Sequence, residues 1–369
     1  MEKILRRCQR RIGVLACLCA IFLIGCWDSS ELSNRGFVTA ISIDIDQDVS
    51  DAYSVTLEMP QISGDEPDKG KDIKTGVHRS LNNAIYSSNS SSERDIFLGH
   101  MKALVCGEGL LKDRELFKHA MDTLIRDRSV SRTLLVLATP GEGADIIDFE
   151  SKDESLIGAY ISNFFKKRNP STLHRQTLDS LAKYFAEGQT AIIPRIEAGD
   201  EGFTFSGAAV MSDYTLRGWL DEYELRALSW LHDNAKHLEF SIEHEEYVLS
   251  IKINKYKSEF DFFELDERLY AKIKIALTGD LEEAPGTKNI DKCLLQRITE
   301  DSIRNDIERV HEALYVRMGV DGFNISRELE KKRPNLHRRH IEIGGIDILD
   351  MPFVLEIDVM ISGTGSIAE

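Results

Sequence analysis

Two short segments in the C-terminal half decide the fold class, because each alternates apolar with polar residues. They read Tyr247-Val248-Leu249-Ser250-Ile251-Lys252-Ile253 and Ile273-Lys274-Ile275-Ala276-Leu277. Alternation with a period of two is typical of a β-strand that buries one face. The link between the two segments is short, which favours antiparallel pairing over the longer crossover of a parallel pair. The sequence therefore predicts an antiparallel hairpin here.

Further elements surround this hairpin in an irregular order. Strands are predicted at residues 38–45, 53–59, 102–105, 134–137 and 353–361, and helices at residues 77–86, 110–125, 171–185 and 291–318. An acidic turn is predicted at residues 46–51 and an exposed loop, rich in Gly, Pro, Asp and Lys, at residues 62–74. The longest helix carries an apolar stripe that comprises Leu294, Ile298, Ile303, Ile307, Val310 and Leu314. This order favours a multi-domain α+β fold of mostly antiparallel or mixed sheets, each flanked by helices, over regular βαβ winding.

The first 25 residues resemble a secretory signal peptide that is cleaved from the chain. Five basic residues and one acidic residue precede the uncharged run 12–24, which is shorter than the roughly 20 residues that a transmembrane helix needs. The run ends in Leu23-Ile24-Gly25-Cys26, which resembles a bacterial lipobox. We therefore expect cleavage before Cys26 and attachment of diacylglycerol to its thiol, since two acyl chains give stable anchoring where one does not. The alternatives are an uncleaved anchor helix or an ordinary buried cysteine.

A composition change at residues 198–202 predicts a boundary between two further parts of the chain. The expected division is a signal peptide at 1–25, an N-terminal domain at 26–200 and a C-terminal domain at 201–369, which could be divided again near residue 265. Removal of the signal peptide takes the net charge from −16 to about −20. A body this acidic argues against binding nucleic acid, whose phosphates are neutralised by Lys and Arg.

Three cysteines remain after cleavage, and one of them is the proposed lipid site. Cys106 and Cys293 could form a disulfide in an oxidising compartment, but both lie in apolar surroundings. Two separate buried thiols are the preferred interpretation.

No catalytic constellation emerges from the motifs. The sequence contains neither Gly-x-Ser-x-Gly nor a zinc-protease His-Glu-x-x-His nor a phosphate-binding Gly-Lys-Ser/Thr loop. Asp44, Asp46 and Asp48 have the spacing that begins a calcium loop, yet Val49 and Val55 stand where glycine and glutamate are needed, so a plain hairpin turn is preferred. His100 could be a general base, but a structural histidine is the preferred interpretation. We expect no enzyme activity, no metal and no cofactor.

The residues that follow the lipobox resemble one family closely. Gly25-Cys26-Trp27-Asp28-Ser29-Ser30-Glu31-Leu32 is similar to the lipobox and first mature residues of the Ger(x)C family, the C-subunit lipoproteins of spore germinant receptors. Further similar stretches follow in the family's order, namely Ile43-Asp44, Gly99-His100-Met101-Lys102, Arg126-Asp127, Gly207-Ala208-Ala209-Val210, Gly218-Trp219-Leu220 with Glu224, and the strand from Tyr247. The chain departs from the family's pattern at Asp321-Gly322-Phe323-Asn324 and Pro334-Asn335-Leu336.

This resemblance implies a non-enzymatic subunit of mixed α/β domains on the outer face of the spore inner membrane. It implies an A-type membrane subunit and a B-type transporter-like subunit as partners in the response to small nutrient germinants. Cys26 is the lipid attachment site in this scheme, and Trp27, Asp28, Glu31 and Leu32 are motif residues without an assigned role. The rival functions are a solute-binding lipoprotein of an importer and an exported enzyme anchored near the cell wall.

Overall fold

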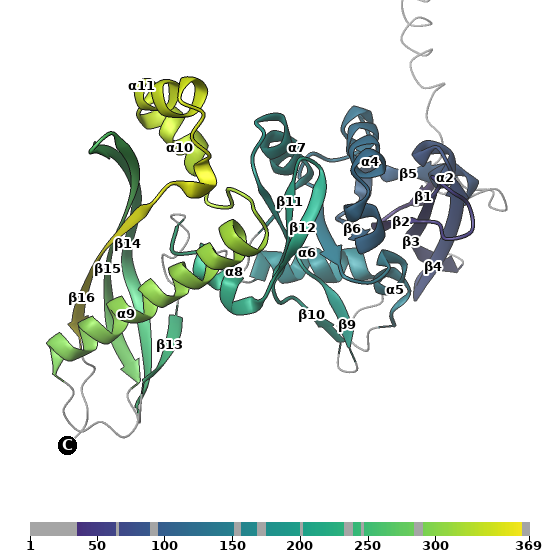
Figure 1. The fold of residues 1–369 in the computed structure, drawn as a ribbon. Coiled ribbons are helices and arrows are strands. Elements are labelled where there is room, and N and C mark those ends of the chain that lie inside the picture. Colours follow the sequence, from purple (N-terminus) through teal and green to yellow (C-terminus); the bar gives the residue numbers. More distant parts are fainter. Residues whose placement is uncertain are drawn as a thin grey trace, which may run out of the picture.

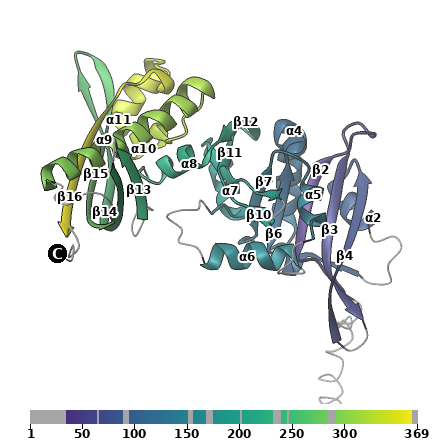
Figure 2. The same cartoon turned by 90° about the horizontal axis from the view of Figure 1, so that it is seen from below.

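The computed structural model describes residues 35–363, except 64–65, 89–94, 151–155, 168–174, 200–201, 232–238, 245–246 and 284–290. The described residues form three main sheets that follow one another along an elongated molecule (Figures 1 and 2). The mixed sheets with flanking helices confirm the α+β prediction. Cys26, Trp27, Asp28, Glu31 and Leu32 lie outside the described residues.

The first sheet has five strands in the order β4-β3-β2-β6-β7. Their bounds are Glu66–His78, Tyr53–Ser63, Ala40–Ile45, Ala103–Gly107 and Leu135–Thr139. β2, β6 and β7 are parallel, whereas β3 pairs antiparallel with both of its neighbours. A short parallel pair, β1 (Arg35–Phe37) and β5 (Asp95–Phe97), stands beside it. The predicted strands 53–59, 102–105 and 134–137 are therefore confirmed.

Helices cover both faces of this sheet, which explains why β6 and β7 are apolar without alternation. Apolar side chains of one face, such as Ile41, Leu57 and Leu104, share a core with α2, α3, α4 and α7. Those of the other face, such as Val105 and Leu137, pack with α5 and α6. The bounds of these helices are Leu81–Ser87, Glu108–Lys112, Arg114–Arg126, Leu178–Ala186, Gly143–Asp148 and Ile157–Lys167, in the order in which they are named here.

Three predictions about this part were wrong in detail. The loop expected at residues 62–74 is mostly strand β4, because β3 is long enough to pair with it along the edge of the sheet, where Gly, Lys and Asp are tolerated. The helix expected at 77–86 begins only at Leu81, since Val77 belongs to β4. The helix expected at 110–125 is divided at Asp113, whose carboxylate caps α4 by accepting the Leu116 amide at 2.9 Å.

The second sheet has three antiparallel strands and connects the two halves. β8 (Ala191–Pro194) pairs with β11 (Ala208–Ser212), and β11 pairs with β12 (Thr215–Leu220). Because side chains alternate along a strand, Ile193 and Ala209 enter the core of the first sheet, while Ile192 and Val210 enter the core of the third. A small hairpin of β9 (Glu197–Gly199) and β10 (Gly202–Thr204) lies at the predicted domain boundary. The second sheet therefore takes β8 from before this boundary and β11 and β12 from after it.

The third sheet has the order β13-β14-β15-β16, with bounds Glu239–His244, Tyr247–Leu265, Arg268–Glu283 and Phe353–Gly363. β14 and β15 form the predicted antiparallel hairpin. Their turn places Asp266 and Glu267 at φ 49° and 64°, the left-handed conformation that suits the twist of a tight hairpin. β16 then pairs parallel to β15.

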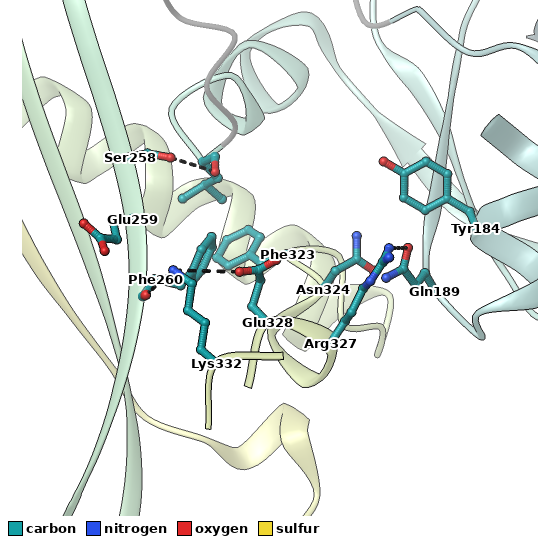
Figure 3. A pocket seen from close by; sticks show the side chains of 11 residues that line it. Tyr184, Gln189, Ser258, Glu259, Phe260, Phe323, Asn324, Arg327, Glu328 and Lys332 are labelled. Atoms are coloured by element: carbon teal, nitrogen blue, oxygen red, sulfur yellow. Dashed lines mark hydrogen bonds and ion pairs between the residues drawn. The ribbon is translucent and has the colours of Figure 1, made fainter. Parts of the chain in front are cut away.

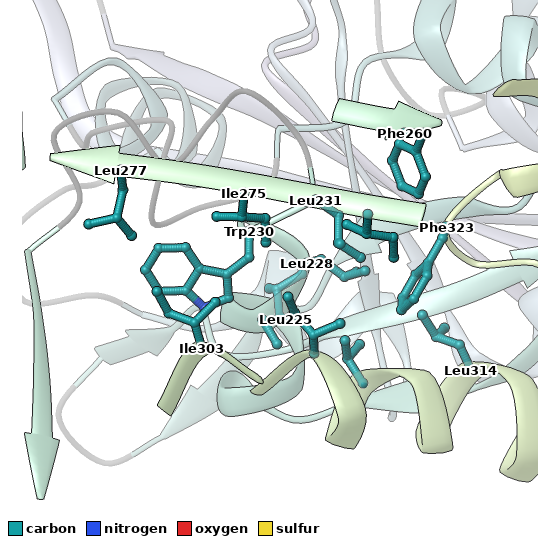
Figure 4. Close-up of a cluster of buried hydrophobic side chains, with 14 of the residues drawn as sticks. Leu225, Leu228, Trp230, Leu231, Phe260, Ile275, Leu277, Ile303, Leu314 and Phe323 are labelled. Carbon is teal, nitrogen blue, oxygen red and sulfur yellow. The ribbon is translucent and has the colours of Figure 1, made fainter. Parts of the chain in front are cut away.

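Helices between β15 and β16 cover one face of this sheet. α9 (Lys292–His311) continues into the π-helical segment η4 (Glu312–Arg317), and α10 (Ile325–Lys332), α11 (Pro334–His337) and the short segments η5 (Arg338–Ile343) and η6 (Ile348–Asp350) follow. The predicted stripe is confirmed except at Leu294, which is 41% exposed, because Leu295 faces the core in its place. Figure 4 shows Trp230 and Phe323 in this core, together with Leu225 and Leu228 of α8 (Glu222–Leu228).

Candidate functional site

Asp44, which the sequence placed at the start of a calcium-like string, caps a helix. Its carboxylate accepts the amides of Gly143 at 2.7 Å and Ala144 at 3.0 Å, at the N-terminus of α5. Burial raises the pKa of Asp44 to about 6, although these two hydrogen bonds act in the opposite direction. Asp46 instead accepts the amides of Asp48 and Val49, as in a turn. No group of three or more His, Cys, Asp or Glu side chains is placed to hold a metal ion within the described residues.

Glu58 repeats this arrangement on the neighbouring strand β3. Its carboxylate accepts the amides of Ile157 at 2.5 Å and Gly158 at 3.0 Å, at the N-terminus of α6, and the hydroxyl of Thr39 at 2.6 Å. Sequence reasoning missed this residue, whose only signal was a carboxylate within a predicted strand. Two buried carboxylates thus hold α5 and α6 on the first sheet. Each lies at a helix N-terminus, where the positive end of the helix dipole stabilises a negative charge.

His100 lies in an aromatic cluster. It ends the short helix η3 (Leu98–His100), and its ring lies 5.1 Å from that of Phe37 and 5.7 Å from that of Phe97. These rings belong to β1 and β5, the parallel pair at the beginning of the described chain. The contacts favour the structural interpretation of His100.

The motif Gly218-Trp219-Leu220 with Glu224 lies where the second and third sheets meet. The indole of Trp219 donates to Glu108 of α3 at 3.0 Å. Glu224 and Asp221 form a reciprocal capping box at the start of α8, and the guanidinium of Arg317 lies 3.0 Å from Glu224. These motif residues therefore link α3, β12, α8 and η4.

A cavity of ≈ 290 Å³ opens between strand β14 of the third sheet and the end of α7 with the segment that follows it (Figure 3). Tyr184 and Gln189 line it from one side, Ser258, Glu259 and Phe260 of β14 from the other, and Asn324, Arg327, Glu328 and Lys332 close it. In Figure 3 the side chains of Arg327 and Glu328 of α10 stand between those of β14 and those of Tyr184 and Gln189. Sequence reasoning missed this site, because its residues come from four distant segments, which include Leu231.

Charged and amide groups join the walls of this cavity. Arg327 pairs with Glu187 at 2.5 Å and donates to the Gln189 side-chain oxygen at 2.9 Å. Lys332 donates to the Phe260 carbonyl at 2.6 Å, which ties α10 to β14. The Nε2 atom of Gln189 is buried without a hydrogen-bond partner among the described residues. The cavity wall therefore offers one unused amide donor.

The segment in which the chain departs from the family's pattern builds one wall of the cavity. Asp321 accepts the amides of Ile325 and Ser326, both at 2.9 Å, and so caps α10. Asn324 adopts the left-handed conformation with φ 54°, and its side-chain oxygen accepts the Thr190 amide at 3.2 Å. The departure thus sets where α10 begins and joins it to the second sheet.

A second cavity, of ≈ 780 Å³, lies between α8, β13 and α9. Asp306 lines it and accepts the indole proton of the buried Trp230 at 3.0 Å. Burial raises the pKa of Asp306, and Arg226 and Arg309 oppose this. The carboxylate thus supports the packing of Trp230 from the rim of this cavity.

The two cysteines in the described part of the chain are both free. Cys106 is buried in β6, and burial raises the pKa of its thiol. Cys293 is exposed near the start of α9, so the expectation that it is buried was wrong; the core-facing positions of that helical turn belong to Leu295 and Ile298. No helix of the described residues has the length and apolar character to cross a membrane.

Comparison with known proteins gives matches over both halves. The family described as "Spore germination protein N-terminal domain" matches residues 28–198, and the one described as "Spore germination B3/GerAC like, C-terminal" matches residues 206–365. Spore germination protein YndF of Bacillus subtilis (strain 168) is 23% identical, and the alignment covers 80% of this chain and 81% of YndF. Putative spore germination protein YfkR of the same organism is 24% identical, with 88% of each chain covered.

A solved structure shares the fold. The crystal structure of the GerBC protein matches 90% of this chain and 99% of its own, with a TM-score of 0.59 and 18% sequence identity. Together, the two family matches span both halves of the described body, and the fold agrees with them. The chain therefore belongs to the Ger(x)C family of spore germination proteins.

Proposed function

We propose that this chain is a lipid-anchored, non-enzymatic subunit of a spore germinant receptor complex, which helps to sense nutrient germinants and to trigger germination. The observation that carries the proposal is the family match over both halves, directly preceded by a lipobox cysteine at position 26. The partners are an A-type and a B-type membrane subunit. The division into residues 26–200 and 201–369 stays a prediction.

The anchor in this proposal is diacylglycerol on Cys26, on the outer face of the spore inner membrane. Two acyl chains bind a bilayer stably, whereas a body with a net charge near −20 gains little from anionic headgroups. Trp27 would then stand at the lipid interface, where the amphipathic indole ring is favoured. Asp28, Glu31 and Leu32 match the family motif without an assigned role.

A non-enzymatic role is supported by what the polar residues do. Asp44 and Glu58 cap helices, and His100 packs against the rings of Phe37 and Phe97, which also contact each other. Glu224 and Trp219 join structural elements. These residues stabilise a body whose task is to contact other subunits.

The test compares Cys26→Ala with Cys293→Ala, which removes an exposed thiol elsewhere. Cys26→Ala should leave the mature N-terminus unlipidated by mass spectrometry, release the protein from membranes in a high-salt wash, and strongly reduce germination with nutrients. Cys293→Ala should change none of these. A Cys26→Ala protein that stays on the membrane and supports normal germination contradicts the proposal.

One observation favours a second candidate, a solute-binding lipoprotein of an importer. The wall of the cavity between α7 and β14 contains a buried amide donor without a described partner, on Gln189. Calorimetric titration with amino acids and sugars separates the two functions. Two results together would favour the importer. The purified protein would bind a solute with submicromolar affinity, and spores of a strain that lacks the protein would germinate normally.

A further inference from the structure

Strand β16 (Phe353–Gly363) ends the third sheet and leaves a long edge without a paired strand in the described structure. It pairs with β15 on one side over residues 353–363, and the sheet order ends with it (Figure 1). The opposite end is formed by β13, which has only six residues. An open edge of this length offers a row of backbone donors and acceptors to another strand.

The register shows which backbone groups face outward. The Ala271 amide donates to the Pro352 carbonyl at 3.0 Å. In a parallel ladder this bond directs the backbone groups of Val354, Glu356 and every second residue after them toward β15. The amides and carbonyls of Leu355, Ile357 and Val359 therefore point away from β15, into the open edge.

The side chains at this edge are incompletely covered. Val359 and Ile361 are fully buried, but Phe353, Leu355 and Ile357 are only partly buried at the margin of the core. On the other face, Met360 is 57% exposed and Val354 is 43% exposed. A further strand beside β16 would bury more of both sets.

The edge that β4 forms in the first sheet differs from this one. β4 carries charges along its sequence, and its Lys71 donates to the carbonyls of Ile147 and Phe149 at 2.9 and 2.7 Å, at the end of α5. Lysine and proline on an edge strand discourage pairing with other chains. β16 contains neither residue, so its edge lacks this protection.

We propose that β16 accepts an extended segment of a partner subunit by β-strand addition, and that this segment alternates apolar with basic residues. Asp358 lies on the solvent-exposed face, where a basic side chain of an added strand would stand opposite it, whereas Glu356 on the same face already pairs with Lys272 of β15. Full antiparallel overlap of two copies of β16 would place Asp358 opposite Asp358, and like charges in that position are destabilising. Charge therefore favours a basic partner strand over a second copy of this acidic chain. The proposal rests on the proposed function for the existence of that partner.

Photo-crosslinking in the full chain tests the edge directly. p-Benzoylphenylalanine replaces Met360 in one strain and Val316, a 64% exposed residue of η4, in a control strain. The Met360 probe should crosslink to a peptide of a co-purifying membrane subunit, identified by mass spectrometry, whereas the Val316 probe should not. Asp358→Lys should abolish this crosslink, and Glu308→Lys, the same charge change on the exposed side of α9, should preserve it. Crosslinks to a second copy of this chain would overturn the edge proposal. The absence of crosslinks in a complex that still co-purifies would overturn it too. Neither outcome would contradict the proposed function.

Residue-resolved amide exchange provides a readout that general destabilisation would not reproduce. On assembly, the amides of Leu355, Ile357 and Val359 should exchange about tenfold or more slowly. Those of Val354, Glu356 and Asp358, which β15 already protects, should hardly change. Equal protection of both sets, or of neither, contradicts strand addition. A chain that co-purifies with no subunit overturns the proposed function and the edge proposal with it.

Discussion

The indole nitrogen of Trp219 donates a 3.0 Å hydrogen bond to Oε1 of Glu108, a residue 111 positions earlier in the chain. Glu108 is the first residue of α3, and Trp219 lies on β12, so the bond joins the first and second sheets. Glu108 also accepts from Lys112 at 2.7 Å. The hydrogen bonds from Lys112 and Trp219 lower the pKa of Glu108, which keeps it ionised as an acceptor.

Replacing Trp219 by Phe should lower the free energy of unfolding by about 1 kcal/mol, because the ring is retained while a hydrogen bond to a charged group is lost. Lys112→Gln is the matched control, since it removes the other partner of Glu108. It should cost less than about 0.5 kcal/mol, because Lys112 is exposed. Urea denaturation measures both. Equal effects of the two changes would show that Trp219 contributes no more than a surface pair.

Asp44 should make stability fall as the pH rises from about 4 to about 6. Its pKa is raised to about 6 in the folded chain, so the folded state binds this proton more tightly than the unfolded state does in that window. About two pKa units correspond to about 3 kcal/mol. The Asp44→Asn variant has no ionisable group at this position. Its free energy of unfolding relative to the wild type should therefore rise by about 3 kcal/mol across this pH window. Asp48→Asn, at an exposed position of the turn that follows β2, should follow the wild-type curve in denaturant titrations at each pH.

Two glycines at the second position of a helix should respond oppositely to alanine. A Cβ atom on Gly158 of α6 would lie 2.2 Å from the Thr39 carbonyl oxygen, so Gly158→Ala should cost about 1–3 kcal/mol. A Cβ atom on Gly109 of α3 meets nothing within 4 Å, so Gly109→Ala should be neutral or stabilising by about 0.5 kcal/mol. Thermal and urea unfolding should rank the two variants on either side of the wild type. A stable Gly158→Ala protein would contradict the close contact between α6 and Thr39, the residue before β2.

Cys293 should be the reactive thiol of the folded body, and Cys106 should be silent. Cys106 is fully buried and burial raises the pKa of its thiol, which suppresses the thiolate that reacts. Titration with a thiol reagent should therefore label Cys293 in the native protein and both cysteines after unfolding. Cys293→Ser should abolish the native reaction. Labelling of Cys106 at the native rate of Cys293 would mean that the first sheet opens readily.

Local patterns were sufficient to predict the strands and helices whose burial follows a simple period. The β14 and β15 hairpin and the stripe on α9 are examples, since one face of each element meets one core. The prediction was wrong at residues 62–74, where β4 forms by pairing with β3 although its own composition resembles a loop. Pairing at a sheet edge depends on the neighbouring strand, and the composition of the edge segment alone does not reveal that strand.

The sequence by itself determined the family resemblance, the signal peptide and lipobox pattern and the α+β class, because each depends on residues that are adjacent or regularly spaced. Only the tertiary structure decided the roles of Asp44 and Glu58 as helix caps, the cavity between α7 and β14, and the open edge of β16. Each of these brings together groups that are about a hundred positions apart, or depends on which strand has no neighbour. Such relations arise from the packing of the sheets, and no local period in the chain encodes them.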